Sequence, residues 1–169
     1  MNKAVFLDRD GVINDNCKPV NKPEDLKIYP WTANAISKLN KSGYHVFVVT
    51  NQGGIEMGYF TRQDLNEIHN KMVKEITENG GFIDDIDYCP HFKSKCDCRK
   101  PSPGMIDKLA KRYNIDLKKS YMIGDRDIDI EAGIKAGCKT IKIGKSSKKA
   151  DYVAKNLLEA VNIILSDFQ

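Results

Sequence analysis

Two aspartates separated by one residue, Asp8 and Asp10, come directly after a short apolar run near the start of the chain. Such a pair can divide the work of phosphoryl transfer, because one carboxylate can attack phosphorus while the other donates and later accepts a proton. A cation must offset the repulsion between the two carboxylates. An Asp-x-Asp pattern alone is common in surface loops, so the neighbouring motifs decide what it means.

Two further clusters carry groups that bind phosphate. Thr50, Asn51 and Gln52 offer a hydroxyl and two side-chain amides, and the glycines that follow expose backbone N–H groups that can hold phosphate oxygens. Arg99 and Lys100 come just before the start of a predicted helix. Two cations there can neutralise the charge that develops on a transferring phosphoryl group. Both clusters therefore suit a phosphorylated substrate.

A fourth cluster is rich in acids. Asp125, Asp127 and Asp129 follow the short apolar run at 121–123, and carboxylate oxygens are the hard ligands that Mg²⁺ prefers. Because the carboxyl ends of parallel strands meet at one edge of a sheet, four polar clusters at successive strand exits indicate one shared site.

The elements that must position these clusters alternate between strands and helices. β-branched and aromatic runs predict buried strands at 3–7, 45–49, 86–88, 121–123 and 139–143. Amphipathic runs predict a helix that ends near Gly43, one from Thr61 to Gly80, one with Ser102 as N-cap and Pro103 as first residue, one at 127–136, and one with the Asn156–Glu159 capping box. The alternation predicts an α/β fold with a doubly wound parallel sheet. The segment 11–30, with three prolines and little periodicity, is expected to cross the sheet's carboxyl edge.

Length and composition predict an ordinary globular protein with a single domain over residues 1–169. Hydrophobic residues make up 41% and charged residues 30% of the chain, which is not the composition of a disordered segment. The net charge of +4 is small and the basic residues are scattered, so nucleic acid is not an expected partner. No apolar run approaches the roughly 18 residues of a membrane span, and the N-terminus lacks signal-peptide zones. We expect a cytoplasmic monomer with no membrane partner.

A compact group of soft and borderline ligands predicts a metal site. Four of them fall within ten residues: Cys89, His91, Cys96 and Cys98. Tetrahedral Zn²⁺ prefers such a set, although the Cys-x-His and Cys-x-Cys spacings differ from the commoner Cys-x-x-Cys. Cys17 and Cys138 are expected to be free thiols, the first in the 11–30 segment and the second in the core.

Several conspicuous aromatic and imidazole side chains are interpreted as structural. His45 begins a strand, and His69 is expected on the polar side of the helix that follows Thr61, so neither is expected to be catalytic. Tyr29 and Trp31 are expected to pack the 11–30 segment onto the sheet, with stacking on a sugar as the alternative.

The order of these motifs resembles that of the haloacid dehalogenase (HAD) superfamily, and the resemblance covers nearly the whole chain. The matching runs are Asp8-Arg9-Asp10-Gly11, Thr50-Asn51-Gln52, Lys100, and Gly124-Asp125 with Asp129. The resemblance implies a HAD-like Rossmannoid fold and Mg²⁺-dependent phosphatase chemistry. It implies that Asp8 is the nucleophile and Asp10 the general acid and base. Thr50 and Lys100 would bind the transferring phosphoryl group, and Asp125 would hold Mg²⁺ together with both catalytic aspartates.

The remaining acids and the substrate-binding residues follow from the same resemblance. Asp129 fits the second acid of the fourth motif, whereas Asp127 lies off the pattern. An acid at position 10 favours phosphatase over dehalogenase chemistry. Asn51 and Gln52 are expected to bind substrate beside Thr50, and Arg99 is expected to bind a second anionic group with its bidentate fork.

The cysteine loop gives a finer resemblance, to the heptose-bisphosphate phosphatases and the related histidinol-phosphatases, in which structural zinc braces the substrate loop. The run 53–61 resembles the heptose enzymes more. No large insertion is present, so no large cap domain is expected, and the segments 11–30 and 53–60 and the zinc-braced loop would shape specificity. The implied reaction removes the 7-phosphate of D-glycero-D-manno-heptose 1,7-bisphosphate, a sugar phosphate of lipopolysaccharide biosynthesis. The alternatives are a histidinol-phosphatase, a nucleic-acid 3′-phosphatase and a non-catalytic zinc-binding module.

Overall fold

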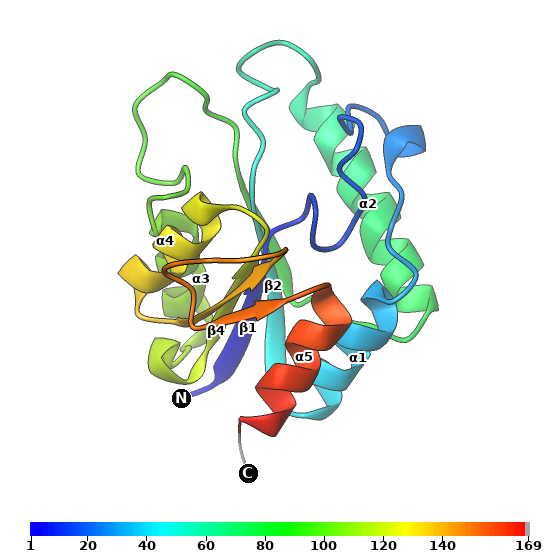
Figure 1. The fold of residues 1–169 in the computed structure, drawn as a ribbon. Coiled ribbons are helices and arrows are strands. Elements are labelled where there is room, and N and C mark those ends of the chain that lie inside the picture. The colour runs from blue at the N-terminus through cyan, green and yellow to red at the C-terminus, as the bar shows by residue number, and fades with distance from the viewer. Residues whose placement is uncertain (168–169) are drawn as a thin grey trace.

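A six-stranded parallel sheet forms the centre of the computed structural model, which describes residues 1–167 (Figure 1). The strands are β1 (Lys3–Leu7), β2 (Tyr44–Asn51), β3 (Asp85–Cys89), β4 (Tyr121–Gly124), β5 (Lys139–Ile143) and β6 (Tyr152–Ala154). Their order across the sheet is β3-β2-β1-β4-β5-β6, and every pair is parallel. The predicted doubly wound parallel sheet is confirmed.

Helices cover both faces of this sheet. They are α1 (Thr32–Lys41), α2 (Arg62–Glu78), α3 (Gly104–Tyr113), α4 (Asp127–Ala136) and α5 (Leu157–Ser166), with short 3-10 helices at Pro23–Asp25 and Leu117–Lys119. In Figure 1, α1 and α5 lie together on one side of the sheet and α3 and α4 on the other. Successive side chains of a strand point to opposite faces. Val5 and Leu7 therefore join the apolar cluster under α1 and α5, and Ala4 and Phe6 join the cluster under α3 and α4.

The strand order places a ligand site at the end of β1. The chain adds β2 on one side of β1 and later β4 on the other, and open α/β sheets bind ligands where the order reverses, outside the carboxyl ends of the strands. The segment from β1 to α1 crosses this edge, as expected. Its two arms are joined by Asp15 N–H to Lys27 O (2.8 Å) and Tyr29 N–H to Ile13 O (3.1 Å). Its Leu26 is buried in the core.

Other details of the sequence prediction are confirmed in part. The Tyr29 and Trp31 rings stack with centroids 4.9 Å apart, and Trp31 packs on the core. Thr61 caps α2 with a reciprocal bond pair to Asp64. The helix α3 begins one residue later than predicted, with Pro103 at the N-cap. Asn156 Oδ1 accepts from Glu159 N–H at 2.9 Å, which is one half of the expected capping box.

Two expectations about the architecture concern a cap domain and a membrane-spanning helix. Within residues 1–167, no segment forms a separate cap domain over the carboxyl edge of the sheet. None of the described helices has the length and apolar character needed to cross a membrane. The short strand β6 was not predicted, because three residues are too few to show a period.

Candidate active site

Three carboxylates converge at the carboxyl edge of the sheet. Oxygens of Asp8, Asp125 and Asp129 lie within 4.8 Å of one another. Asp8 follows β1, Asp125 follows β4, and Asp129 belongs to the first turn of α4. Two glycines make this approach possible: a Cβ atom on Gly11 would lie 2.1 Å from Asp125 Oδ2, and one on Gly124 would lie 2.1 Å from Asp129 Cβ. The residue types at positions 11 and 124 are therefore part of the site.

The Lys100 ammonium is the cation at the centre of this group. Lys100 is 3% exposed, and its Nζ lies 2.9 Å from Asp8 Oδ1, 2.7 Å from Asp129 Oδ1 and 2.8 Å from Val49 O. Burial lowers the pKa of Lys100, but the two carboxylates outweigh burial and raise it. The Asn51 amide holds the Lys100 backbone, donating to its O (3.1 Å) and accepting from its N–H (3.0 Å). Asn51 thus positions the loop that carries the lysine.

The carboxylates hold more negative charge than one lysine neutralises. Burial raises the pKa of Asp8 to about 7, with Asp129 and Asp10 adding to the increase and Lys100 opposing it. Burial and Asp129 also raise the pKa of Asp125. Asp125 Oδ1 is buried and has no hydrogen-bond partner among the described residues. A divalent cation would satisfy that oxygen and offset the repulsion, so the residues present fit Mg²⁺.

The Asp10 carboxylate faces a different set of partners. Its Oδ1 accepts hydrogen bonds from Arg9 Nε (3.1 Å), Arg9 Nη2 (3.0 Å) and Asn14 Nδ2 (3.0 Å), and its Oδ2 lies 3.4 Å from Gln52 Nε2. Burial raises the pKa of Asp10, but these partners outweigh it and hold the pKa below its ordinary value. Gln52 Nε2 also donates to Thr50 Oγ1 (2.9 Å). Asp10 is not one of the three convergent carboxylates, and its predicted role as a magnesium ligand stays a prediction.

Arg9 and His69 extend this network into the interior. Arg9 is 1% exposed and its Nη1 lies 3.1 Å from His69 Nε2. The prediction that His69 lies on the polar side of its helix is wrong, because the side chain is only 7% exposed. His69 follows Leu65 by four residues and so shares its buried stripe. Burial, reinforced by the charge on Arg9, lowers the pKa of His69 to about 3, so the imidazole is neutral.

A small cavity of about 150 Å³ opens onto these groups. It is lined by Asp8, Asp10, Asn16, Asn51, Lys100, Asp125, Arg126, Ile128 and Asp129. Sequence reasoning gave no role to Arg9, Asn14, Asn16 or Arg126. Asn16 Nδ2 donates to Asp125 Oδ2 at 3.1 Å, and this pair is 109 residues apart in sequence, so no local pattern could have revealed it.

The four predicted zinc ligands come together where β3 ends at Cys89 and in the loop that follows it. The Cys89 Sγ lies 2.9 Å from Cys98 Sγ, 3.6 Å from Cys96 Sγ and 3.4 Å from His91 Nδ1. All four ligand atoms lie within 4.8 Å of one another. Three thiols and an imidazole nitrogen aimed at one point are the donor set of a closed, structural zinc site, so these residues fit Zn²⁺.

The loop between β2 and α2 is fastened to this cysteine loop by one carboxylate. Glu56 accepts from the backbone N–H groups of Phe92 (3.0 Å), Lys93 and Ser94 (3.2 Å), and from the Ser94 hydroxyl. These hydrogen bonds, that of Ser94 Oγ first, lower the pKa of Glu56 to about 2. Arg99, at the other end of the cysteine loop, donates from Nη1 to His91 O at 2.8 Å. Its guanidinium carbon lies 5.4 Å from the centre of the Phe92 ring.

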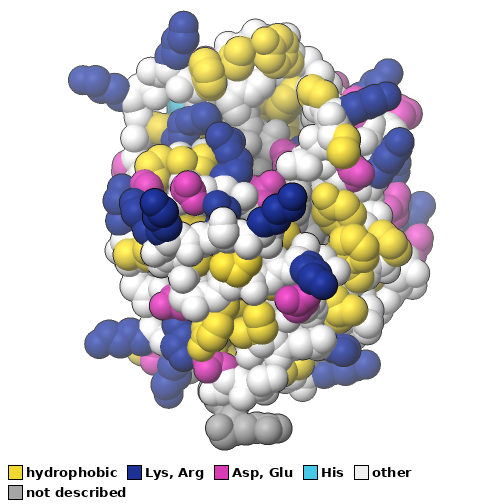
Figure 2. Space-filling model, in the orientation of Figure 1, with side chains coloured by type: hydrophobic (Ala, Val, Ile, Leu, Met, Phe, Trp, Pro, Cys, Tyr) yellow, Lys and Arg dark blue, Asp and Glu magenta, His cyan; other side chains and the backbone are white. Residues whose placement is uncertain are grey.

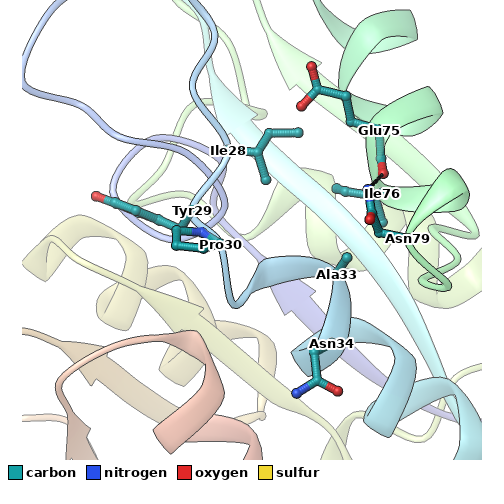
Figure 3. Close-up of a pocket in the computed structure, with 8 residues that line it drawn as sticks. All are labelled: Ile28, Tyr29, Pro30, Ala33, Asn34, Glu75, Ile76 and Asn79. Carbon is teal, nitrogen blue, oxygen red and sulfur yellow. Dashed lines mark hydrogen bonds between the residues drawn. The ribbon is translucent and has the colours of Figure 1, made fainter.

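The basic side chains of the surface and the lining of a second cavity bear on where else a phosphate could bind. Basic side chains are scattered over the face shown in Figure 2 rather than gathered in one patch. A second cavity, of about 360 Å³, lies between the start of α1 and the end of α2 (Figure 3). Its lining residues are Ile28, Tyr29, Pro30, Ala33, Asn34, Glu75, Ile76 and Asn79. This lining contains one carboxylate and no basic side chain, so it does not suit a phosphate.

The fold matches known structures over its full length. A family model described as HAD-hydrolase-like matches residues 97–167. The crystal structure of D,D-heptose 1,7-bisphosphate phosphatase from B. bronchiseptica, complexed with magnesium and phosphate, is 32% identical and superposes with a TM-score of 0.90. The match covers 99% of both chains. The fold is therefore that of the HAD-like hydrolases.

Sequence relatives narrow this class further. The D-glycero-beta-D-manno-heptose-1,7-bisphosphate 7-phosphatase of Rhodopseudomonas palustris is 44% identical over 142 residues, which is 79% of each chain. The D-glycero-alpha-D-manno-heptose-1,7-bisphosphate 7-phosphatase of Photorhabdus laumondii is 38% identical over 153 residues, 84% of each chain. The chain belongs to the family of D-glycero-D-manno-heptose-1,7-bisphosphate 7-phosphatases.

Proposed function

We propose that this protein is a Mg²⁺-dependent phosphatase that removes the 7-phosphate of D-glycero-D-manno-heptose 1,7-bisphosphate, a step of lipopolysaccharide biosynthesis. The observation that carries the proposal is the pairing of Asp8 and Lys100 at the sheet edge, beside two further carboxylates. Family membership supports the choice of substrate, and it leaves the anomer open because relatives of both names are similar to the chain.

The first step of the proposed reaction transfers the phosphoryl group to Asp8. Lys100 engages Oδ1 of Asp8, which leaves Oδ2 to attack phosphorus. The bond from Oδ2 to phosphorus forms as the bond to the sugar oxygen breaks, and Asp10 gives its proton to that oxygen. Thr50 Oγ1 already accepts a bond from Gln52, so its own hydroxyl hydrogen is free for a phosphate oxygen. Bound Mg²⁺ would supply positive charge against the carboxylates and the phosphate.

The second step returns Asp8 to its starting state. Asp10 takes a proton from a water molecule, the water oxygen bonds to phosphorus, and the bond to Asp8 breaks to release inorganic phosphate. Arg9 stabilises the carboxylate form of Asp10, which is the form that this second step needs. A phosphate dianion beside Asp10 favours its protonated form in the first step.

Zinc is proposed as a second, structural metal held by the four-ligand cluster. Four protein ligands leave no open position for water, so this metal would take no part in the chemistry. Its proposed task is to hold the loop that ends in Arg99 and Lys100, where Arg99 meets the second phosphate of the substrate. That task is supported by the Arg99 bond to His91 O, which ties the guanidinium to a residue of the cluster.

Phosphate release across a substrate panel tests the proposal. The panel contains both anomers of heptose 1,7-bisphosphate, fructose bisphosphate, histidinol phosphate and a 3′-phosphorylated oligonucleotide. The expected result is the highest kcat/KM for one heptose bisphosphate anomer, with the phosphate at C1 retained in the product. If histidinol phosphate or the oligonucleotide has a higher kcat/KM, the proposed substrate is wrong and the protein is a histidinol-phosphatase or a nucleic-acid 3′-phosphatase. No turnover of any phosphate would favour a non-catalytic zinc-binding protein.

The proposed location of the reaction is the cytoplasm, and the proposed form is a monomer. The location is supported by the cysteines, since none of the five forms a disulfide in the structure and unpaired cysteines persist in reducing compartments. Size-exclusion chromatography with light scattering tests the monomer.

A further inference from the structure

We infer that His69 is a positioning residue for the proton-transfer steps: it fixes the Arg9 guanidinium, which in turn fixes the carboxylate of Asp10. The inference rests on the proposed function, because that function makes Asp10 the general acid and base. Its basis is a chain of hydrogen-bonded side chains that joins His69 on α2 to Arg9 and Asp10, which directly follow Asp8 at the end of β1.

The direction of the hydrogen bonds in this chain follows from their chemistry. A guanidinium carries only donors, so in the 3.1 Å contact between Arg9 Nη1 and His69 Nε2 the imidazole nitrogen must accept. His69 is therefore neutral, with its proton on Nδ1. The other two nitrogens of the guanidinium, Nε and Nη2, both donate to Asp10 Oδ1. Contacts from all three nitrogens leave Arg9, itself 1% exposed, a single orientation.

This orientation determines which oxygen of Asp10 can move a proton. Both Arg9 bonds and the Asn14 bond go to Oδ1, whereas within residues 1–167 Oδ2 has only the 3.4 Å contact with Gln52. Oδ2 is thus the atom left to face the leaving oxygen or the attacking water. Without an acceptor at position 69, the buried Nη1 group would be unsatisfied and the fork would shift to find one. A small displacement of a proton donor is enough to slow a reaction severalfold or more.

Three substitutions at position 69 separate this role from simple packing. His69→Gln keeps an acceptor near the place of Nε2, His69→Asn moves the acceptor to the place of Nδ1, and His69→Leu removes it. First-turnover release of the alcohol is measured for a sugar phosphate and for 4-nitrophenyl phosphate. We expect His69→Leu and His69→Asn to slow sugar release about tenfold and to leave nitrophenol release within about twofold, because nitrophenolate leaves without a proton. His69→Gln should restore sugar release to within about threefold.

Packing defects alone would give another pattern. If His69→Gln is as slow as His69→Asn, or if both substrates slow equally in step with the melting temperature, the inference is wrong. Should His69→Leu fail to fold, the comparison of Gln with Asn still decides. An independent readout is ¹⁵N NMR of the wild-type imidazole at pH 7, where a proton on Nε2 would overturn the inference.

The inference and the proposed function fail in distinguishable ways. The comparison of leaving groups uses any sugar phosphate that the wild type hydrolyses, so a lack of activity on heptose bisphosphate refutes only the proposed substrate. Asp10→Asn serves as the reference, since it should show the same selective loss for the sugar phosphate, and a larger one. If Asp10→Asn slows both substrates equally, Asp10 is not the general acid and base. The positioning role of His69 is then wrong as well.

Discussion

The two clusters of ligand atoms in this protein are built on opposite principles. The carboxylates of Asp8, Asp125 and Asp129 sit at the ends of sheet strands and the start of a helix, and a buried lysine already links two of them. The thiols and imidazole of the cysteine cluster sit in a loop without regular secondary structure beyond Cys89, where they contact mainly one another. The first cluster is held by the fold, whereas we propose that a metal, together with Glu56, holds the loop of the second.

The largest expected effect is at the carboxylate cluster, where a substitution should abolish most of the activity without lowering the melting temperature. Asp8→Asn should lower kcat a thousandfold or more, measured as phosphate release, because an amide is a poor nucleophile. Its metal-free melting temperature at pH 7 should not fall. The folded-state pKa of Asp8 is about 7 against an ordinary 3.8, so ionised Asp8 costs the folded protein stability as the pH rises between these values.

A neighbouring acid provides the control for this variant. The Asp127 carboxylate pairs with Lys142 and is 75% exposed, so Asp127→Asn should keep kcat within about twofold. A tenth of wild-type kcat in Asp8→Asn, or a clear loss of melting temperature, would contradict the proposed division between chemistry and fold.

The cysteine cluster should show the reverse behaviour. Cys96→Ser/Cys98→Ser should release the metal and lower the melting temperature by about 5 °C or more, because the loop loses its brace. Turnover of 4-nitrophenyl phosphate should fall much less than turnover of a sugar bisphosphate. Elemental analysis should find one zinc per chain in the wild type and in Cys17→Ser, which changes an exposed thiol outside the cluster. If wild-type protein without zinc keeps full activity, the proposal that the cluster supports the substrate-binding loop is wrong.

A smaller effect is expected where the loop meets the substrate. Arg99→Ala should raise KM for a bisphosphate about tenfold and for a monophosphate about twofold or less, because only the bisphosphate loses an ion pair. Lys95→Ala removes a positive charge from the same loop and should change both values equally little. If Arg99→Ala raises KM equally for both substrates, the guanidinium stabilises the loop through His91 and does not bind the second phosphate.

The smallest effect is expected at Glu56, which links the loop between β2 and α2 to the cysteine loop. Glu56→Gln loses the charge that holds three backbone N–H groups of the cysteine loop. We expect the melting temperature to fall by about 2 °C and KM for a sugar bisphosphate to rise about twofold. Glu78→Gln, on the exposed last turn of α2, should change neither. A larger effect in Glu56→Gln than in the cysteine variant would mean that the carboxylate, and not the metal, holds this loop.

The site residues that the sequence analysis expected to lie close together share one property. Asp8, Thr50, Lys100 and Asp125 each lie beside a strand exit or a helix start, so the alternation of strands and helices was enough to bring them together. The partners that sequence reasoning missed are held by contacts between distant segments. Arg9 and His69 are 60 residues apart, and no single window of sequence contains both. The spacing of His69 from Leu65 did indicate burial, but an imidazole on an amphipathic helix was interpreted as polar.

The interpretation of residue roles was limited in the same way. Asn51 was assigned to the substrate from its place in a motif, yet its amide holds the Lys100 backbone across 49 residues of sequence. Glu56 carried no signal, because one acid in a glycine-rich loop is unremarkable and the three residues that donate to it lie 36 to 38 residues away. Sequence patterns predict which residues gather, whereas the bonds among them depend on the tertiary fold.

The central place of β1 in the sheet has a consequence for how the protein is made. The strand β1, which Asp8 follows, is translated before its neighbour β4, and β4, with Asp125 beyond it, comes more than a hundred residues later. A nascent or prematurely terminated chain therefore carries Asp8 with one edge of its strand uncovered and with no acid opposite it. Such a fragment lacks Asp125 and Asp129, so it cannot form the three-carboxylate cluster. Catalytic competence thus reports that the chain has been translated at least as far as β4 and α4.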